Sequence, residues 1–203
     1  TVQVQGDGAS LPGITVTFTV DGTDGTISPA QAVTGIDGKA SAIFKPGTVA
    51  GTATITATVL HEELDEPLTK SVGQEIDHAA PYAVSNLQYD SEVTAGDTAD
   101  IVIRMHDKYG NLVDNRRTAE TVTFMVGQIA GGTGATFIGG TDEITVAVDA
   151  EGNAAARLQV DTKAGPNIVS VTFPGSIAPR PPLIIVGREN GEPAEIYMSI
   201  SPK

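Results

Sequence analysis

Apolar and polar residues alternate along most of this chain, and this period of two limits the possible folds more than any other feature. In the stretch GITVTFTV, for example, Ile14, Val16 and Phe18 share one side and threonines occupy the other. Such alternation is typical of β-strands that bury one face. No stretch shows convincing helical spacing of apolar residues at i, i+3, i+4 and i+7. The sequence therefore predicts an all-β chain.

The same alternation recurs in TATITATV, ETVTFMV and NIVSVTF. Turn signals such as DGTDG, GIDGK, KYGN and AEGN separate the runs at spacings of roughly 8 to 12 residues, which is typical of sandwiches and barrels. Because the chain has neither cysteine nor tryptophan, a sandwich core must be built from aliphatic side chains and single aromatic rings. The aromatic residues predicted to lie in the cores are Phe18, Phe44, Phe124, Phe137 and Phe173.

The sequence also repeats itself. A shift of 114 residues aligns residues 34–75 with residues 148–189 without a gap, and we expect the apolar alternation to stay in phase throughout. Upstream, ITVTFTV matches ETVTFMV at a shift of 106, so the second copy is longer by eight residues (114 − 106). We assign these extra residues to a loop in the glycine-rich segment GQIAGGTGATFIGG.

The two copies predict the domain organisation. Residues 1–78 are predicted to form a β-sandwich that lacks its first strand, and residues 79–190 a complete one. The segment EIYMSISPK alternates like a strand, so residues 191–203 are predicted to begin a third repeat. The chain is therefore expected to be part of a longer tandem array.

The segments DKYGNLVDN, ETVTFMV and DAEGNAAARL, in that order, resemble the bacterial immunoglobulin-like domains of group 1. This family supplies repeats of invasin- and intimin-like outer-membrane adhesins and of many prokaryotic surface proteins. The resemblance implies tandem immunoglobulin-like β-sandwich domains that act as an extracellular or cell-surface spacer. The family has no catalytic residues to carry over, so no enzyme activity is expected.

The resemblance leads to one principal functional hypothesis and one alternative. The first is a non-catalytic structural or spacer repeat of a prokaryotic cell-surface or adhesin-like protein, with the neighbouring repeats of the same chain as partners. The alternative is a carbohydrate-binding or accessory module of a secreted enzyme. Carbohydrate sites generally present aromatic rings, and the chain has only 4 Tyr and 5 Phe. Tyr109, in the DKYGN turn, is the possible ligand contact, and a protein or glycan partner is left unidentified.

Charge and composition exclude several classes of partner and site. The chain has 25 acidic and 12 basic residues, a net charge of −13, and no basic patch to neutralise phosphates. Nucleic acid and anionic membrane surfaces are therefore not expected as partners. The lack of cysteine excludes disulfides and thiolate metal sites. The three histidines lack metal-ligand spacing, no nucleophile or phosphate-binding motif occurs, and no cofactor is expected.

The stretch VDAEGNAAARL is the one most similar to a metal site. Asp149, Glu151 and Asn153 alternate as the first oxygen ligands of a calcium loop do. However, Ala154 and Val160 replace the glycine and the glutamate that such a loop requires at its sixth and twelfth positions. These replacements favour a turn over a calcium loop.

The aligned copy supports the turn. Lys39, a cation, replaces Asn153, whereas the glycine between the strands is kept in both copies. Glycine accepts the positive φ that a tight hairpin needs, and a polar neighbour can hydrogen-bond the backbone. The residues predicted to form structural turns are Gly38, Gly110, Asn111 and Gly152.

Two other pairs of carboxylates are weak calcium candidates. Asp21 and Asp24 lie three apart in a glycine-rich loop, and turn composition explains them equally well. Glu75 and Asp77 lie at the end of the first copy, where a site between tandem modules could bind calcium. Only Glu75 recurs in the second copy, as Glu189, which argues against that site.

The ends of the chain suggest a mode of association. The first copy is predicted to lack a first strand, and residues 191–203 are predicted to supply one without a body. An unpaired strand edge is a template for strand addition, so the tail of one molecule could complete the first module of another by head-to-tail strand exchange. A frayed tail, or a tail packed on its own module, is the competing hypothesis.

Overall fold

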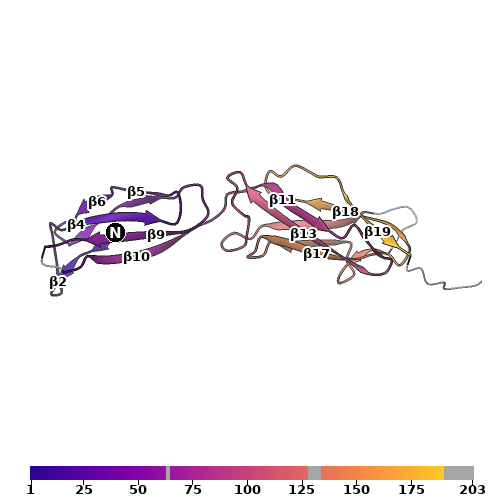
Figure 1. Ribbon diagram of the computed structural model, residues 1–203, viewed down its shortest axis with the longest axis horizontal. Helices are drawn as coiled ribbons and strands as arrows, with labels where there is room; N and C mark the ends of the chain where they lie inside the picture. The colour runs from indigo at the N-terminus through magenta and orange to yellow at the C-terminus, as the bar shows by residue number, and fades with distance from the viewer. Residues whose placement is uncertain (63–64, 128–133, 190–203) are drawn as a thin grey trace, which may run out of the picture. The chain divides into compact units, whose positions relative to one another are not determined.

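The structure is a computed structural model that describes residues 1–62, 65–127 and 134–189 (Figure 1). The chain divides into two compact units. Unit 1 comprises Thr1–Ala79 with Tyr109–Asn111, and unit 2 comprises Ala80–Lys108 with Leu112–Lys203. The predicted strand in residues 191–203, and residues 128–133 of the predicted glycine-rich loop, lie outside the described residues.

All regular secondary structure in the described ranges is β-strand, so the prediction of an all-β chain is confirmed. No helix in those ranges is long and apolar enough to cross a membrane.

Unit 1 contains one larger sheet and three short pairs. The four-stranded antiparallel sheet has the order β10-β9-β4-β6, and the pairs are β1-β7, β2-β3 and β5-β8. The strands of unit 1 are β1 (Val2–Gln3), β2 (Gln5–Gly6), β3 (Ala9–Ser10), β4 (Thr15–Asp21), β5 (Thr26–Ser28), β6 (Gln31–Val33), β7 (Lys39–Ala40), β8 (Ile43–Lys45), β9 (Gly51–Val59) and β10 (Leu68–Ile76).

The core of unit 1 is small and follows the alternation of the sequence. Val16 and Phe18 point inward from β4, and Val16 lies opposite Val59 of β9. Val4 and Ala40, which lie outside the four-stranded sheet, complete the buried cluster. Phe44 is only half-buried, so this core relies mainly on β-branched side chains and one ring.

Unit 2 contains two sheets that share one core. The first sheet has the order β11-β13-β17-β15, and the second has the order β12-β19-β18-β14-β16. The strands of unit 2 are β11 (Pro81–Tyr89), β12 (Glu92–Thr94), β13 (Thr98–Asp107), β14 (Thr121–Gly127), β15 (Thr136–Phe137), β16 (Glu143–Ala147), β17 (Asn153–Gln159), β18 (Gly165–Thr172) and β19 (Leu183–Arg188).

The core of unit 2 lies between these sheets. Ile101 and Ile103 of β13 pack from the first sheet, and Val169 of β18 packs from the second. Phe124 and Phe137 are fully buried, with ring centroids 6.3 Å apart and an edge-on interplanar angle of 61°. Two facing sheets closed over an aliphatic and aromatic core make unit 2 a β-sandwich.

The last strand pairs in a different register in the two units. In unit 1, Val72 of β10 lies opposite Ile55 of β9. Under the shift of 114, these residues correspond to Val186 and Val169, but Val169 lies opposite Leu183 instead. The difference of three residues is odd, so aligned residues face opposite sides of the sheet. The expectation that the alternation stays in phase is therefore wrong for this strand, because the chain turns back at a different point: residues 60–67 separate the pair Val59 and Leu68, whereas residues 170–182 separate the pair Val169 and Leu183.

Candidate functional site

The hairpin turn of unit 1 is built around Gly38. Its N–H donates to the carbonyl of Gly35 at 2.9 Å, and the N–H of Gly35 donates to the carbonyl of Lys39 at 3.0 Å. Gly38 has φ of 70°, and a Cβ there would lie 2.7 Å from the carbonyl oxygen of Val4. The position therefore requires glycine both for conformation and for space.

The turn of unit 2 repeats this backbone geometry. The N–H of Gly152 donates to the carbonyl of Asp149 at 3.1 Å, and the N–H of Asp149 donates to the carbonyl of Asn153 at 2.9 Å. Gly152 has φ of 79°, and a Cβ there would lie 2.6 Å from Cδ1 of Leu112. Both glycines that the sequence repeat retains thus lie at the same point of a hairpin.

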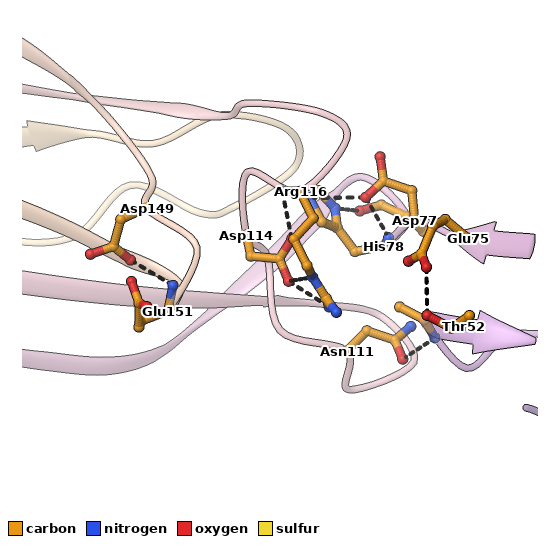
Figure 2. Close-up of polar contacts among 11 residues, drawn as sticks. Thr52, Glu75, Asp77, His78, Asn111, Asp114, Arg116, Asp149 and Glu151 are labelled. Atoms are coloured by element: carbon orange, nitrogen blue, oxygen red, sulfur yellow. Dashed lines mark hydrogen bonds and ion pairs between the residues drawn. The ribbon is translucent and has the colours of Figure 1, made fainter. Parts of the chain in front are cut away.

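The carboxylate of Asp149 serves the turn itself. Oδ1 accepts hydrogen bonds from the backbone N–H of Glu151 at 3.0 Å and of Asn153 at 2.7 Å, and Oδ2 accepts one from Nδ2 of Asn153 at 3.1 Å. Figure 2 shows Asp149 turned toward the backbone of Glu151. These bonds, that from the Asn153 N–H foremost, lower the pKa of Asp149. The carboxylate therefore acts as an acceptor for its own hairpin.

Asp24 joins two loops of unit 1. Its Oδ2 accepts from both the N–H and the hydroxyl of Thr48 at 2.8 Å, and its Oδ1 accepts from the N–H of Val49 at 2.8 Å. The backbone N–H of Thr48 is the first cause, and that of Val49 the second, of a pKa lowered to about 2. A Cβ at Gly47 would collide with this carboxylate, so a larger residue there would displace Asp24 from these hydrogen bonds.

In unit 2 an aspartate also joins two loops, but it lies on the loop that has glycine in unit 1. Oδ2 of Asp161 accepts from the N–H of Gly134 at 3.2 Å, and Oδ1 accepts from the N–H of Lys163 at 3.0 Å. Under the shift of 114, Asp161 corresponds to Gly47, so the aspartate has moved from one loop to the other. The sequence analysis did not predict either connection. The alignment of Gly47 in the first copy with Asp161 in the second could have indicated them.

The remaining weak calcium candidates do not gather at one point. Glu75 accepts a hydrogen bond from the hydroxyl of Thr52 at 2.5 Å, and Asp77 accepts one from the N–H of His78 at 3.0 Å (Figure 2). Asp21 is an exposed residue at the end of β4, opposite Thr54. Across residues 1–62, 65–127 and 134–189, no three His, Asp or Glu side chains are grouped in a way that could hold a metal ion.

The KYGN turn lies in the part of the chain grouped with unit 1. Gly110 has φ of 90°, and no atom lies within 4 Å of the point where its Cβ would be. Asn111 donates from Nδ2 to the carbonyl of Thr48 at 2.7 Å and accepts at Oδ1 from the N–H of Ala50 at 2.9 Å. Tyr109 is 52% exposed, so its ring is accessible to a ligand.

A buried carboxylate in unit 2 was not predicted from the sequence either. The side chain of Asp114 is almost fully buried and accepts from the Arg116 backbone N–H at 3.0 Å and Nε at 2.8 Å, with Nη2 at 2.7 Å (Figure 2). The pair lies two residues apart in LVDNRR, where the sequence shows no pattern that would mark it as buried. In the described part of the chain, no buried side-chain nitrogen or oxygen lacks a hydrogen-bond partner.

The fold defines the class of the protein. Both units consist of strands, and unit 2 has two sheets closed over one core, as in immunoglobulin-like β-sandwiches. Residues 1–71 match the model of the bacterial Ig-like domain (group 1), which bears out the predicted resemblance to that family. The predicted fold and the predicted family are confirmed.

Several solved structures are similar to the chain. The D0-D1 domain of intimin is 19% identical, with 91% of this chain and 86% of that chain covered and a TM-score of 0.38. The Escherichia coli adhesin FdeC is 19% identical, with coverages of 89% and 55% and a TM-score of 0.45. A β-glycosidase from Bacteroides vulgatus is 16% identical, with a TM-score of 0.38; 85% of this chain covers only 21% of the enzyme. A comparison with curated proteins found no match.

Proposed function

We propose that this chain is a non-catalytic spacer segment of a prokaryotic cell-surface protein, in which it holds an adhesive or other distal part away from the envelope. The observation that carries the proposal is the match of residues 1–71 to the bacterial Ig-like domain (group 1). Repeats of this family are common in surface proteins, and the sequence repeats itself over residues 34–75 and 148–189.

The chemistry of the described side chains supports a structural role. Asp24, Asp149 and Asp161, three acidic residues of loops and turns, accept hydrogen bonds from nearby backbone N–H groups. Bonds of this kind hold a loop in one conformation, and they lower the pKa of Asp24 and of Asp149. A spacer needs such stable loops between strands, whereas a catalytic acid or base needs a group that reaches a substrate.

A protease-accessibility experiment on the cells that produce the protein tests this proposal. Intact cells are treated with trypsin, and released peptides from residues 1–189 are identified by mass spectrometry. Release without lysis is the expected result, with a cytoplasmic enzyme as the control that must stay intact. Release of these peptides only after lysis contradicts a surface spacer.

A carbohydrate-binding role is the second candidate, and the exposure of Tyr109 favours testing it. The half-exposed ring of Tyr109 can stack on a sugar, although the chain has few other aromatic side chains. A glycan array probed with the chain and with Tyr109→Ala separates the two functions. Binding that is lost in the variant favours the carbohydrate role, and an absence of binding by the native chain favours the spacer.

A further inference from the structure

Strand β16 forms the most regular free edge of unit 2. It lies at the end of the sheet β12-β19-β18-β14-β16, so its outer side pairs with no strand among the residues that the structure describes. All five of its residues, Glu143–Ala147, lie opposite β14 without a bulge, and none is proline. The other edge strands of unit 2 are protected, since β11 has two register shifts and β12 and β15 contain only three and two residues. Short or bulged strands pair poorly with further strands, so β16 is the edge most open to one.

The backbone of β16 offers hydrogen-bonding groups on this free side. The carbonyl of Asp142 accepts from the N–H of Val126 at 2.8 Å. At the other end, the N–H of Val148 donates to the carbonyl of Glu120 at 2.9 Å. In an antiparallel ladder every second residue bonds to the same neighbour, so the odd-numbered residues between these two ends point their N–H and C=O groups away from β14. These outward residues are Glu143, Thr145 and Ala147.

Unit 1 blocks the same edge with a proline. Its strand β6 takes the place of β16 at the end of the larger sheet, beside β4, the counterpart of β14. Under the shift of 114, Pro29 corresponds to Glu143. The N–H of Phe18 donates to the carbonyl of Ala30, so position 29 faces the free side, where proline offers no N–H. Unit 2 keeps this donor, and its edge is therefore open where that of unit 1 is closed.

Two apolar side chains beside the edge of unit 2 are not fully covered. Ile144 and Val146 pack against the core of this unit but are only partly buried. A further strand on the free edge would cover more of both side chains. Burial of apolar surface stabilises association, so side chains and backbone favour the same partner, another strand.

We propose that β16 pairs antiparallel with β16 of a second copy of this chain, with Thr145 opposite Thr145 on the twofold axis. This register places Glu143 opposite Ala147 and Ile144 opposite Val146. Core-facing residues then lie opposite core-facing residues, so the two sheets join into one continuous sheet. The residues with free N–H and C=O groups also face one another and can exchange hydrogen bonds. The interface is isologous, as expected for a closed dimer.

Self-complementarity selects this register over its neighbours. A slip of two residues in one direction places Val146 opposite Asp142, which breaks the apolar pairs. A slip in the other direction places Glu143 opposite Asp149, which brings like charges face to face. Apolar pairs directly opposite one another stabilise a sheet, whereas like charges in that position destabilise it. The proposed register has the apolar pairs and no opposed like charges.

Cysteine cross-linking tests the pairing, because the native chain has no cysteine. Neighbouring strands lie about 5 Å apart, so the two copies of Thr145 are close enough for a short thiol-to-thiol cross-linker. Thr145→Cys in the full chain is therefore expected to give a covalent dimer.

Thr172→Cys is the matched control. Thr172 lies opposite Thr123, which lies opposite Thr145, so positions 145 and 172 belong to one row across the sheet. In the proposed dimer the two copies of position 172 are about five strand spacings, or about 24 Å, apart, which a short cross-linker does not span. Cross-linking by Thr145→Cys alone supports the proposal. No cross-linking by Thr145→Cys, or equal cross-linking by Thr172→Cys, overturns it.

A proline exchange provides an independent measurement by size-exclusion chromatography with light scattering. Glu143→Pro gives unit 2 the proline of unit 1 and removes one outward N–H from each copy. This variant is expected to weaken the native dimer at least about tenfold, because two hydrogen bonds are lost. Glu143→Ala keeps the N–H and is expected to dimerise like the native chain. Circular dichroism melts verify that each variant is folded.

Three results of these measurements overturn the proposal. The first is a native chain that is monomeric at every concentration. The second is equal dimerisation of the Glu143→Pro and Glu143→Ala variants. The third is a dimer lost on removal of residues 191–203, which would indicate head-to-tail exchange instead.

Discussion

Truncation of Phe124 to alanine should destabilise unit 2 strongly, because it removes an aromatic ring from the middle of the core. The ring is fully buried and lies edge-on to Phe137 at 6.3 Å. Phe→Ala changes in cores cost about 3 to 5 kcal/mol, and an edge-on aromatic pair contributes about 0.5 to 1.5 kcal/mol beyond its buried area. We therefore expect Phe124→Ala to lower the free energy of unfolding of unit 2 by about 5 kcal/mol, a large share of the roughly 5 to 15 kcal/mol that stabilises a domain.

The corresponding residue of unit 1 provides an internal comparison. Phe18 aligns with Phe124 at the shift of 106, but it is 6% exposed and packs in a smaller cluster. The partly buried neighbours can close over the space left by Phe18→Ala. This change should therefore lower the free energy of unfolding of unit 1 by about 3 kcal/mol, the lower end of the range.

Urea denaturation of the full chain, followed by far-ultraviolet circular dichroism, measures both losses. Phe124→Ala should shift the unfolding transition of unit 2, and Phe18→Ala that of unit 1. Thr121→Ala, at an exposed position on the same strand as Phe124, should change stability by no more than about 0.5 kcal/mol. A Phe124→Ala loss no greater than that of Thr121→Ala would refute the assignment of this ring to the core.

Three further predictions concern the loops. Asp24 has a folded pKa of about 2, below the ordinary value of 3.8, so its carboxylate stabilises unit 1 above pH 3.8 and this contribution is lost as the pH falls toward 2. The urea midpoint of Asp24→Asn should therefore vary less with pH over this interval than that of the native chain. The same pH dependence in both proteins would contradict the hydrogen-bond account. Gly152→Ala should lower the melting temperature more than Gly110→Ala, because both glycines have positive φ but only a Cβ at position 152 would collide with Leu112. An equal fall in melting temperature for the two variants would show that the contact with Leu112 does not matter. Asp149→Ala should lower the melting temperature equally with and without calcium, since the carboxylate holds its turn; a calcium-dependent rise in the native chain alone would indicate a metal site.

Much of the core could be predicted from the sequence, because alternation is a direct record of which side of a strand is buried. The alternation places Val16, Phe18 and Phe124 on inward faces, and the structure buries all three. It places Phe44 and Phe173 there too, and these two rings are only partly buried. Periodicity gives the face of a residue but not how much of the opposite side is covered.

The register of β10 and the aspartate connections could not be predicted in the same way. The partner of Val72 depends on how the chain returns after residue 60, which involves a loop with no periodic pattern. Asp24 reaches Thr48 from a loop 24 residues away, and in unit 2 the aspartate comes from the opposite loop. These contacts depend on the placement of loops in space, and a single sequence carries little information about that.

Removal of one module from the protein that contains this chain tests the spacer account most directly. Residues 1–78 are deleted, and the distance between the cell envelope and a tag placed beyond the array is measured by immunoelectron microscopy. The account predicts a shorter distance with the tagged part still folded and displayed. An unchanged distance, or loss of a catalytic activity on deletion, would contradict it.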